Sequence, residues 1–109
     1  MRIVMRNNAQ LPNKYVRFAK WKGYGLGRKF DHLLYMHIHI NAEGKSPTTY
    51  GVTIRLGIPG HDLFVQNKST SLDDLFKKSF DSSKRRLIKS KEMTKNVLRP
   101  NTNEDDTNL

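Results

Sequence analysis

Residues 32–58 read HLLYMHIHINAEGKSPTTYGVTIRLGI and decide the fold of this chain. Apolar and polar residues alternate through 32–42 and again through 50–58, which is the period of a strand with one buried face. Gly44, Ser46 and Pro47 separate the two runs and predict a turn. The residues expected on the buried face are Leu34, Met36, Ile38, Ile40, Tyr50, Val52, Ile54, Leu56 and Ile58. The stretch therefore predicts two consecutive strands of a half-buried sheet.

After residue 58 the sequence predicts a third strand and a helix. Pro59–Asp62 is a turn signal, and Leu63–Lys68 is short and partly β-branched or aromatic, as in an edge strand. The hydroxyl of Ser71 can accept a backbone N–H of a first helical turn, and the acidic residues that follow favour the positive helix end. The helix should run to about Met93. Its apolar stripe consists of Leu72, Leu75, Phe76, Phe80 and Leu87, with the small Ser79 and Ser83 among them.

Before residue 32 the sequence predicts a strand and a helix. Residues 2–6 alternate in character and are expected to form a short strand. From Pro12 to Phe30 apolar residues recur at the spacing of one helical face, and proline suits a first helical turn. Three glycines within 23–27 oppose this helix, because each costs about 1 kcal/mol relative to alanine. We expect the helix either to break there or to depend on packing.

The predicted order is strand, helix, three strands, helix. It defines an α+β fold, a β-α-β-β-β-α sandwich with two helices packed on one face of a four-stranded sheet. The length of 109 residues allows one hydrophobic core. We expect one domain over residues 1–95 and a disordered acidic tail over residues 96–109.

Composition narrows the classes of function. Twenty Lys and Arg against ten Asp and Glu give a formal charge of +10, which predicts a polyanionic partner, with a merely solubilising surface as the alternative. The absence of cysteine excludes disulfides, thiolate zinc sites and cysteine nucleophiles. No signal peptide or run of 18 apolar residues occurs, so we expect a cytoplasmic protein with no membrane partner.

The most informative charges lie on the last predicted helix. They are Lys84, Arg85, Arg86, Lys89 and Lys91, preceded by Lys77 and Lys78. At about 100° per residue most of them flank or oppose the apolar stripe, and Arg86 falls at its edge. Arginine can contact phosphate with two prongs, whereas lysine acts as a point charge. The run predicts a phosphate-binding surface, and a solvated helix face is the simpler alternative.

Residues 52–92 read VTIRLGIPGHDLFVQNKSTSLDDLFKKSFDSSKRRLIKSKE and resemble the second half of the ribosome hibernation-promoting factor and ribosome-associated inhibitor family. Four features carry the likeness: an alternating strand ending in Pro-Gly, a short strand ending in a polar basic segment, a capped helix, and its Lys-Arg-Arg-Leu-x-Lys-x-Lys ending. The element order resembles that fold over residues 1 to about 93. Without the extra carboxy-terminal domain of long members, the chain resembles a short form.

The resemblance implies a non-enzymatic role in stress and stationary phase. Such proteins bind the small ribosomal subunit in the decoding cleft, overlap the paths of mRNA and tRNA, and hold idle ribosomes inactive. No cofactor, metal or small-molecule substrate is implied, and we expect a monomer off the ribosome. The family's RNA-facing positions map onto Lys84, Arg85, Arg86, Lys89, Lys91 and Lys68, and, near the end of the first helix, onto Lys22, Arg28 and Lys29.

Three alternatives stay open. In the glycine-rich segment, Trp21 and Tyr24 could stack on unpaired bases, or Trp21 could belong to the core. A general double-stranded RNA-binding module has a similar element order, although the first strand and the Pro-Gly turn argue against it. A metal-dependent enzyme could be built on His37 and His39 with His32 and His61. No carboxylate accompanies them on the strand face, which argues against this.

Overall fold

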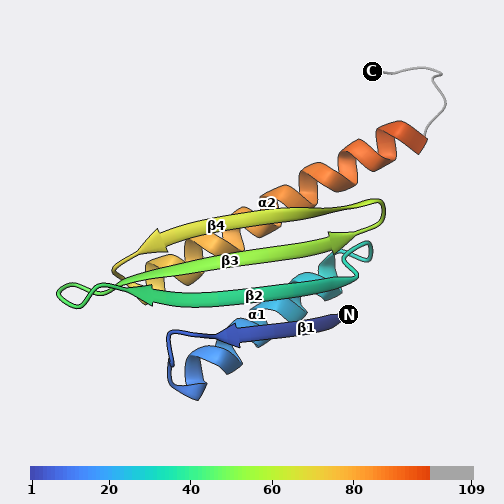
Figure 1. The fold of residues 1–109 in the computed structure, drawn as a ribbon. Coiled ribbons are helices and arrows are strands. Elements are labelled where there is room, and N and C mark those ends of the chain that lie inside the picture. The colour runs from blue at the N-terminus through green and yellow to red at the C-terminus, as the bar shows by residue number, and fades with distance from the viewer. Residues whose placement is uncertain (99–109) are drawn as a thin grey trace.

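The structure is a computed structural model that describes the backbone of residues 1–98 and the side chains of residues 1–91. Six elements follow one another, and Figure 1 shows their arrangement. They are β1 (Arg2–Asn7), α1 (Asn13–Lys29), β2 (Tyr35–Glu43), β3 (Thr49–Ile58), β4 (His61–Ser69) and α2 (Leu72–Leu98). The order is the predicted β-α-β-β-β-α.

The four strands form one mixed sheet in the order β1-β2-β3-β4. The last three make an antiparallel meander, in which Ile38 lies opposite Ile54 and Ile54 opposite Val65. β1 instead runs parallel to β2, because α1 carries the chain back along the sheet between them. β4 is an edge strand, as predicted.

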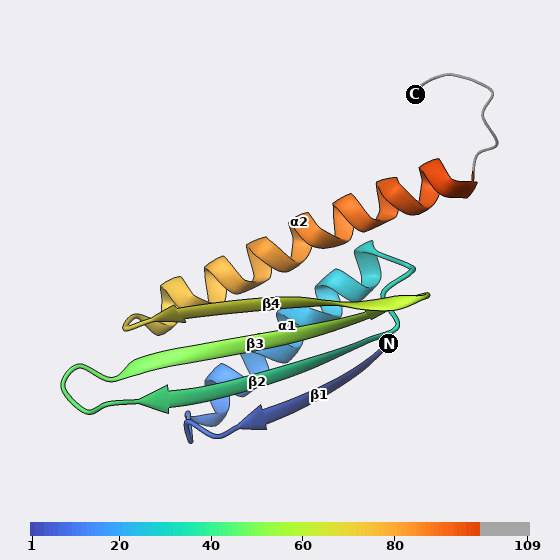
Figure 2. The ribbon, with the colours of Figure 1, turned by 45° about the horizontal axis from the view of Figure 1, so that its top comes forward.

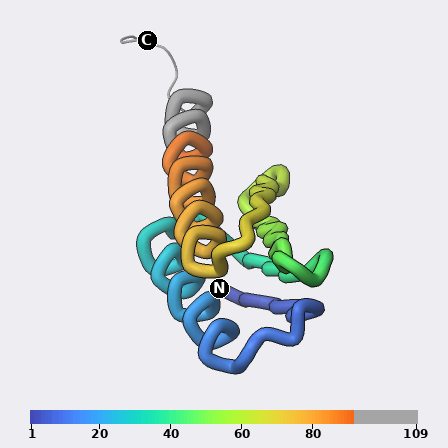
Figure 3. The backbone as a smooth tube through the Cα atoms, turned by 90° about the vertical axis from the view of Figure 1, so that its left-hand side faces the viewer, coloured from blue at the N-terminus to red at the C-terminus, as the bar shows by residue number. Residues whose placement is uncertain are grey.

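Both helices cover the same face of the sheet, as the end-on view in Figure 3 shows. The core lies between the two layers. Fully buried strand residues meet fully buried residues of α2, such as Leu75 and Leu87. The strand residues buried to this degree are Met36, Ile38, Ile40, Val52, Ile54 and Leu56. The predicted two-layer α+β sandwich is confirmed.

One predicted core position is wrong. Leu34 is 54% exposed, whereas its neighbour Leu33 is buried. The alternation of β2 continues backwards through residues 32–34 and so predicts a buried Leu34. These residues belong instead to the turn before β2, which begins only at Tyr35. In this turn the N–H of Leu34 donates to the carbonyl oxygen of Gly57 (2.8 Å), which leaves its side chain at the end of the sheet.

α1 continues unbroken through its three glycines. A Cβ at Gly23 would lie 2.7 Å from Cδ1 of Ile3 and 3.0 Å from Sδ of Met36. The glycine thus allows the helix backbone to approach the sheet closely, and the packing gained there offsets the weak helix preference. Of the two outcomes expected for this segment, the structure has the helix that depends on packing.

α2 begins as predicted and ends later. The N–H of Asp74 donates to Oγ of Ser71 (3.3 Å), which is the expected cap. The helix runs to Leu98, beyond the predicted end near Met93, and it extends past the end of the sheet (Figure 2). Within residues 1–98 neither helix is long and apolar enough to cross a membrane. Most of the predicted tail, residues 99–109, lies outside the described residues.

Two side-chain contacts fix α2 on the rest of the molecule. Nδ2 of Asn67 on β4 donates to Oγ of the buried Ser79 (3.4 Å). Farther along the helix, Nε2 of His32 lies 3.0 Å from Oγ of Ser90 and joins the α1–β2 turn to α2. These contacts position the basic half of α2 relative to both α1 and the edge of the sheet.

Candidate nucleic-acid interface

The positive charge of the chain is concentrated in the helical layer. Residues 13–29 of α1 contain six Lys and Arg and no Asp or Glu. Residues 72–91 of α2 contain seven Lys and Arg and three Asp. Thirteen of the twenty basic residues therefore lie in these two helical segments, which gives this layer a strong attraction for a polyanion.

A groove of about 650 Å³ lies between the two helices. Its aromatic walls are Tyr15, Phe18, Phe76 and Phe80, and the cations beside them are Lys14, Lys22 and Lys77. A second hollow adjoins this groove and shares Lys22, Phe80 and Asp81 with it. The helical face thus combines apolar ring surfaces with mobile positive charges.

The aromatic side chains of this groove pack in a defined way. The rings of Tyr15 and Phe76 are stacked, with centroids 6.2 Å apart, and Phe18 meets Phe76 edge to face at the same distance. Trp21 is 64% exposed, so it is not a core residue. Nζ of Lys22 lies 5.9 Å from the ring centroid of Phe18 and 5.7 Å from that of Trp21. Exposed rings beside a cation remain available for stacking.

The structure brings together some of the nine predicted RNA-binding residues. Lys22, Arg28 and Lys29 from α1 and Lys84 from α2 line the same hollow, although they are far apart in sequence. Arg85 and Arg86 lie on the other flank of α2, where they line a separate hollow with residues 64–67 of β4.

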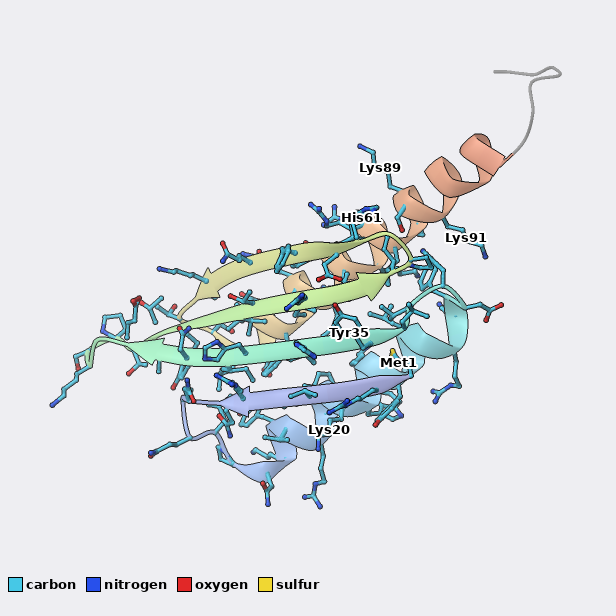
Figure 4. The ribbon with its side chains drawn as sticks, turned by 45° about the vertical axis from the view of Figure 1, so that its right-hand side comes forward. Met1, Lys20, Tyr35, His61, Lys89 and Lys91 are labelled. Atoms are coloured by element: carbon cyan, nitrogen blue, oxygen red, sulfur yellow. The ribbon has the colours of Figure 1, made fainter. Side chains whose placement is uncertain are left out.

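The other predicted residues lie apart from these two groups. Lys89 and Lys91 point to opposite sides of α2 (Figure 4). Lys68 projects from the face of the sheet that the helices leave open, and its Nζ lies 3.5 Å from Oε2 of Glu43. The predicted set therefore does not form one continuous patch.

Sequence reasoning missed the middle of the helical groove. Lys14 and Lys77 belong to it; Lys14 lies outside every predicted site, and Lys77 belongs to the predicted basic run but not to the nine predicted RNA-binding residues. The signal that could have found them is the spacing of α1, where Lys14, Phe18 and Lys22 recur every four residues and so share one helix face. Such a face carries aromatic and basic residues together.

The histidines lie in different parts of the structure and have different neighbours. His32 contacts Ser90, whereas Nε2 of His39 lies 2.8 Å from Nδ2 of Asn8 on the open face. Burial, followed by the nearby charge of Lys91, holds the pKa of His32 below its ordinary value of 6.5. Within the residues whose side chains are described, no three His, Asp or Glu side chains gather as a metal site requires.

The fold places the chain in the class of small β-α-β-β-β-α sandwiches with both helices on one face of a mixed sheet. No family model and no curated protein matches the chain. Solved structures do match it. A ribosomal subunit interface protein from Coxiella burnetii has a TM-score of 0.72 at 17% identity, covering 84% of this chain and 99% of that one. The N-terminal domain of Protein Y from Thermus thermophilus has a TM-score of 0.63 at 17% identity, covering 79% of this chain and 91% of that one.

The fold of this chain is therefore that of a ribosomal subunit interface protein. The resemblance to the hibernation-promoting factor family is confirmed at the level of the fold. At 17% identity the likeness does not carry the roles of individual residues, which rest on the geometry described above.

Proposed function

We propose that this chain binds RNA of the small ribosomal subunit in the decoding cleft through its helical face, and so holds ribosomes inactive. The observation that carries the proposal is the concentration of thirteen Lys and Arg on two adjacent helices of a fold shared with a ribosomal subunit interface protein. In this proposal the bound protein inhibits by steric exclusion, because it occupies the space that mRNA and tRNA need. Its role is binding without catalysis, as a monomer off the ribosome.

The helical face would bind RNA mainly through phosphates. The basic run from Lys77 to Lys91 spans about 21 Å of helix axis at 1.5 Å per residue. Lys84 and the basic end of α1 line the same hollow. An RNA backbone that enters this hollow would contact cations from both helices. Arg85 and Arg86 can each make two-pronged contacts on the outer flank. Each such contact releases counterions from the RNA. The salt dependence of binding therefore grows with the number of phosphates contacted.

Cosedimentation with purified 30S subunits over a series of salt concentrations tests this proposal. We expect the wild-type protein to pellet with the subunit at low salt, to protect decoding-centre nucleotides, and to inhibit translation in a purified system. The double variant Lys22→Ala/Lys84→Ala should bind more weakly and reduce the slope of log K against log salt by about 1.4 to 1.8, at 0.7 to 0.9 per lost phosphate contact.

Lys45→Ala is the control, because Lys45 is an exposed cation in the β2–β3 turn, away from the helical face. Its slope should equal that of the wild type. Failure of the wild-type protein to pellet at low salt would refute the proposal. Full competition by an arbitrary RNA duplex would identify a general double-stranded RNA-binding module instead.

A further inference from the structure

The face of the sheet opposite the helices carries a second group of aromatic and basic side chains. Tyr35 and His37 come from β2, Arg55 from β3, and Asp62 and Phe64 from β4. In the register of the sheet His37 lies opposite Arg55, and Arg55 opposite Phe64. The group therefore forms a row across three strands, which we call the platform: Tyr35, His37, Arg55 and Phe64. Tyr35 is labelled in Figure 4.

Hydrogen bonds fix two members of the platform, Tyr35 and Arg55. Oη of Tyr35 donates to Oδ1 of Asp62 (2.7 Å), and Nε of Arg55 donates to Oδ2 of the same carboxylate (2.6 Å). These two bonds, that from Tyr35 first, hold the pKa of Asp62 below its usual range. The ring of Tyr35 lies directly over Gly57, where a Cβ would overlap it. The guanidinium and the phenol ring are thus oriented before any ligand arrives.

The platform presents flat surfaces to solvent. Cζ of Arg55 lies 5.9 Å from the ring centroid of Tyr35 and 5.9 Å from that of Phe64. The ring centroids of Tyr35 and His37 are 5.0 Å apart, and the two rings are tilted by 44°. Phe64 is 54% exposed near the middle of an edge strand, and its side chain points away from the core. Exposed rings packed around a guanidinium in this way offer stacking surfaces for unpaired bases.

The charge of this face fits an anionic ligand. Its two carboxylates are already engaged, Asp62 by Arg55 at 2.6 Å and Glu43 by Lys68 at 3.5 Å. Arg2 and Arg6 project from β1 on the same face, and neither has a salt-bridge partner among residues 1–91. The excess charge that is left is positive.

A hollow at the edge of β4 connects the platform with α2. Phe64 lines this hollow together with Arg85 and Arg86. A chain with a base stacked on Phe64 therefore has two arginines within reach for its phosphates. Single-stranded RNA matches these features, because its unpaired bases are planar and its backbone is anionic. In a duplex the base faces are covered by stacking.

We propose that the open face of the sheet binds a short single-stranded RNA segment, with one base stacked on Phe64, a neighbouring base over Arg55 and Tyr35, and the backbone passing Arg85 and Arg86 at the β4 edge. This site lies on the other side of the sheet from the groove between the helices. The two sites share Arg85 and Arg86 at the β4 edge, whereas the platform belongs to this site alone.

Binding of a U8 RNA that carries one central 2-aminopurine, on which its uracil neighbours stack poorly, tests the site with the full-length protein alone. Stacking quenches the fluorescence of 2-aminopurine, so the wild-type protein should lower it on binding. Phe64→Ala should weaken binding by about 5- to 150-fold, the range for loss of one stacked base, and should reduce the quench. Phe64→Trp should retain both, which excludes a general folding defect as the cause.

Leu34→Ala is the matched control, because Leu34 is exposed to the same 54% and lies outside the platform. It should bind as the wild type does. The loss caused by Phe64→Ala should have the same size when Lys22→Ala/Lys84→Ala is present, which separates this site from the helical face. Equal binding by Phe64→Ala and the wild type would overturn the proposal. A wild-type dimer in analytical ultracentrifugation that becomes a monomer in Phe64→Ala would also overturn it, by showing that the face pairs with a second copy.

Discussion

Replacing Gly25 and Gly23 of α1 separately by alanine tests how this helix packs. The nearest side-chain atom to a Cβ at Gly25 is Nη2 of Arg28, at 3.9 Å, so the new methyl group makes an ordinary van der Waals contact and no clash. Gly25→Ala should therefore stabilise the protein by about 0.5 to 1 kcal/mol, the penalty of glycine within a helix.

The same substitution at Gly23 meets the sheet. Its Cβ would lie 2.7 Å from Cδ1 of Ile3 and 3.0 Å from Sδ of the fully buried Met36. Overpacking of this kind costs about 1 to 3 kcal/mol. The gain in helix preference is common to the two variants and cancels in their comparison. Gly23→Ala should thus be less stable than Gly25→Ala by about 1 to 3 kcal/mol.

Urea unfolding followed by circular dichroism measures the difference, with m-values that should stay unchanged. In thermal unfolding each kcal/mol should shift Tm by about 4 to 8 °C for a domain of this size. Equal stability of the two alanine variants would refute the close approach of α1 to β1 and β2. A Gly25→Ala variant less stable than the wild type would refute a continuous helix at that position.

Three further substitutions address the pH dependence, the cap and the core. The lowered pKa of His32 means that the unfolded chain binds a proton more readily, so stability should fall as pH drops through about 6.5, and His32→Gln should remove that part of the fall in urea titrations at several pH values. Ser71→Ala should cost about 0.5 to 2 kcal/mol through loss of the bond from the N–H of Asp74, and Ser71→Asp should retain most of it; a neutral Ser71→Ala would contradict the cap. Leu75→Ala, at a fully buried site, should cost about 2 to 5 kcal/mol in the same assay, and a loss below 1 kcal/mol would contradict its place in the core.

Much of the fold could be predicted because the decisive patterns are local. Alternation in β2 and β3 assigned Met36 and Ile54 to the buried face, because successive strand residues point to opposite sides. Alternation does not show where a strand begins, and for this reason Leu34 was wrongly assigned to the core. The continuity of α1 also escaped local reasoning, because it depends on side chains of β1 and β2 that pack against Gly23.

The candidate sites divide in the same way. The basic run of α2 could be predicted, because its charges and its apolar stripe lie on one continuous segment. Lys22 and Lys84 line the same hollow because of the way the two helices pack, and no local sequence pattern specifies that packing. The row from Tyr35 through Arg55 to Phe64 depends on strand register. The strand positions that alternate with the buried ones identify the residues of the open face. They do not show which of these residues contact one another.

The parallel pairing of β1 with β2 has a consequence for how the molecule assembles. Its partners, such as Arg2 and Tyr35, are 33 positions apart, whereas β2 and β3 first meet at Glu43 and Thr49, six positions apart. At (3/2)RT ln n, closing the longer loop costs about 1.5 kcal/mol more. We expect the meander to form first, so that Val52→Ala slows folding while Ile3→Val mainly speeds unfolding in stopped-flow measurements. β1, which is synthesised before the meander, is then the last strand to join the sheet.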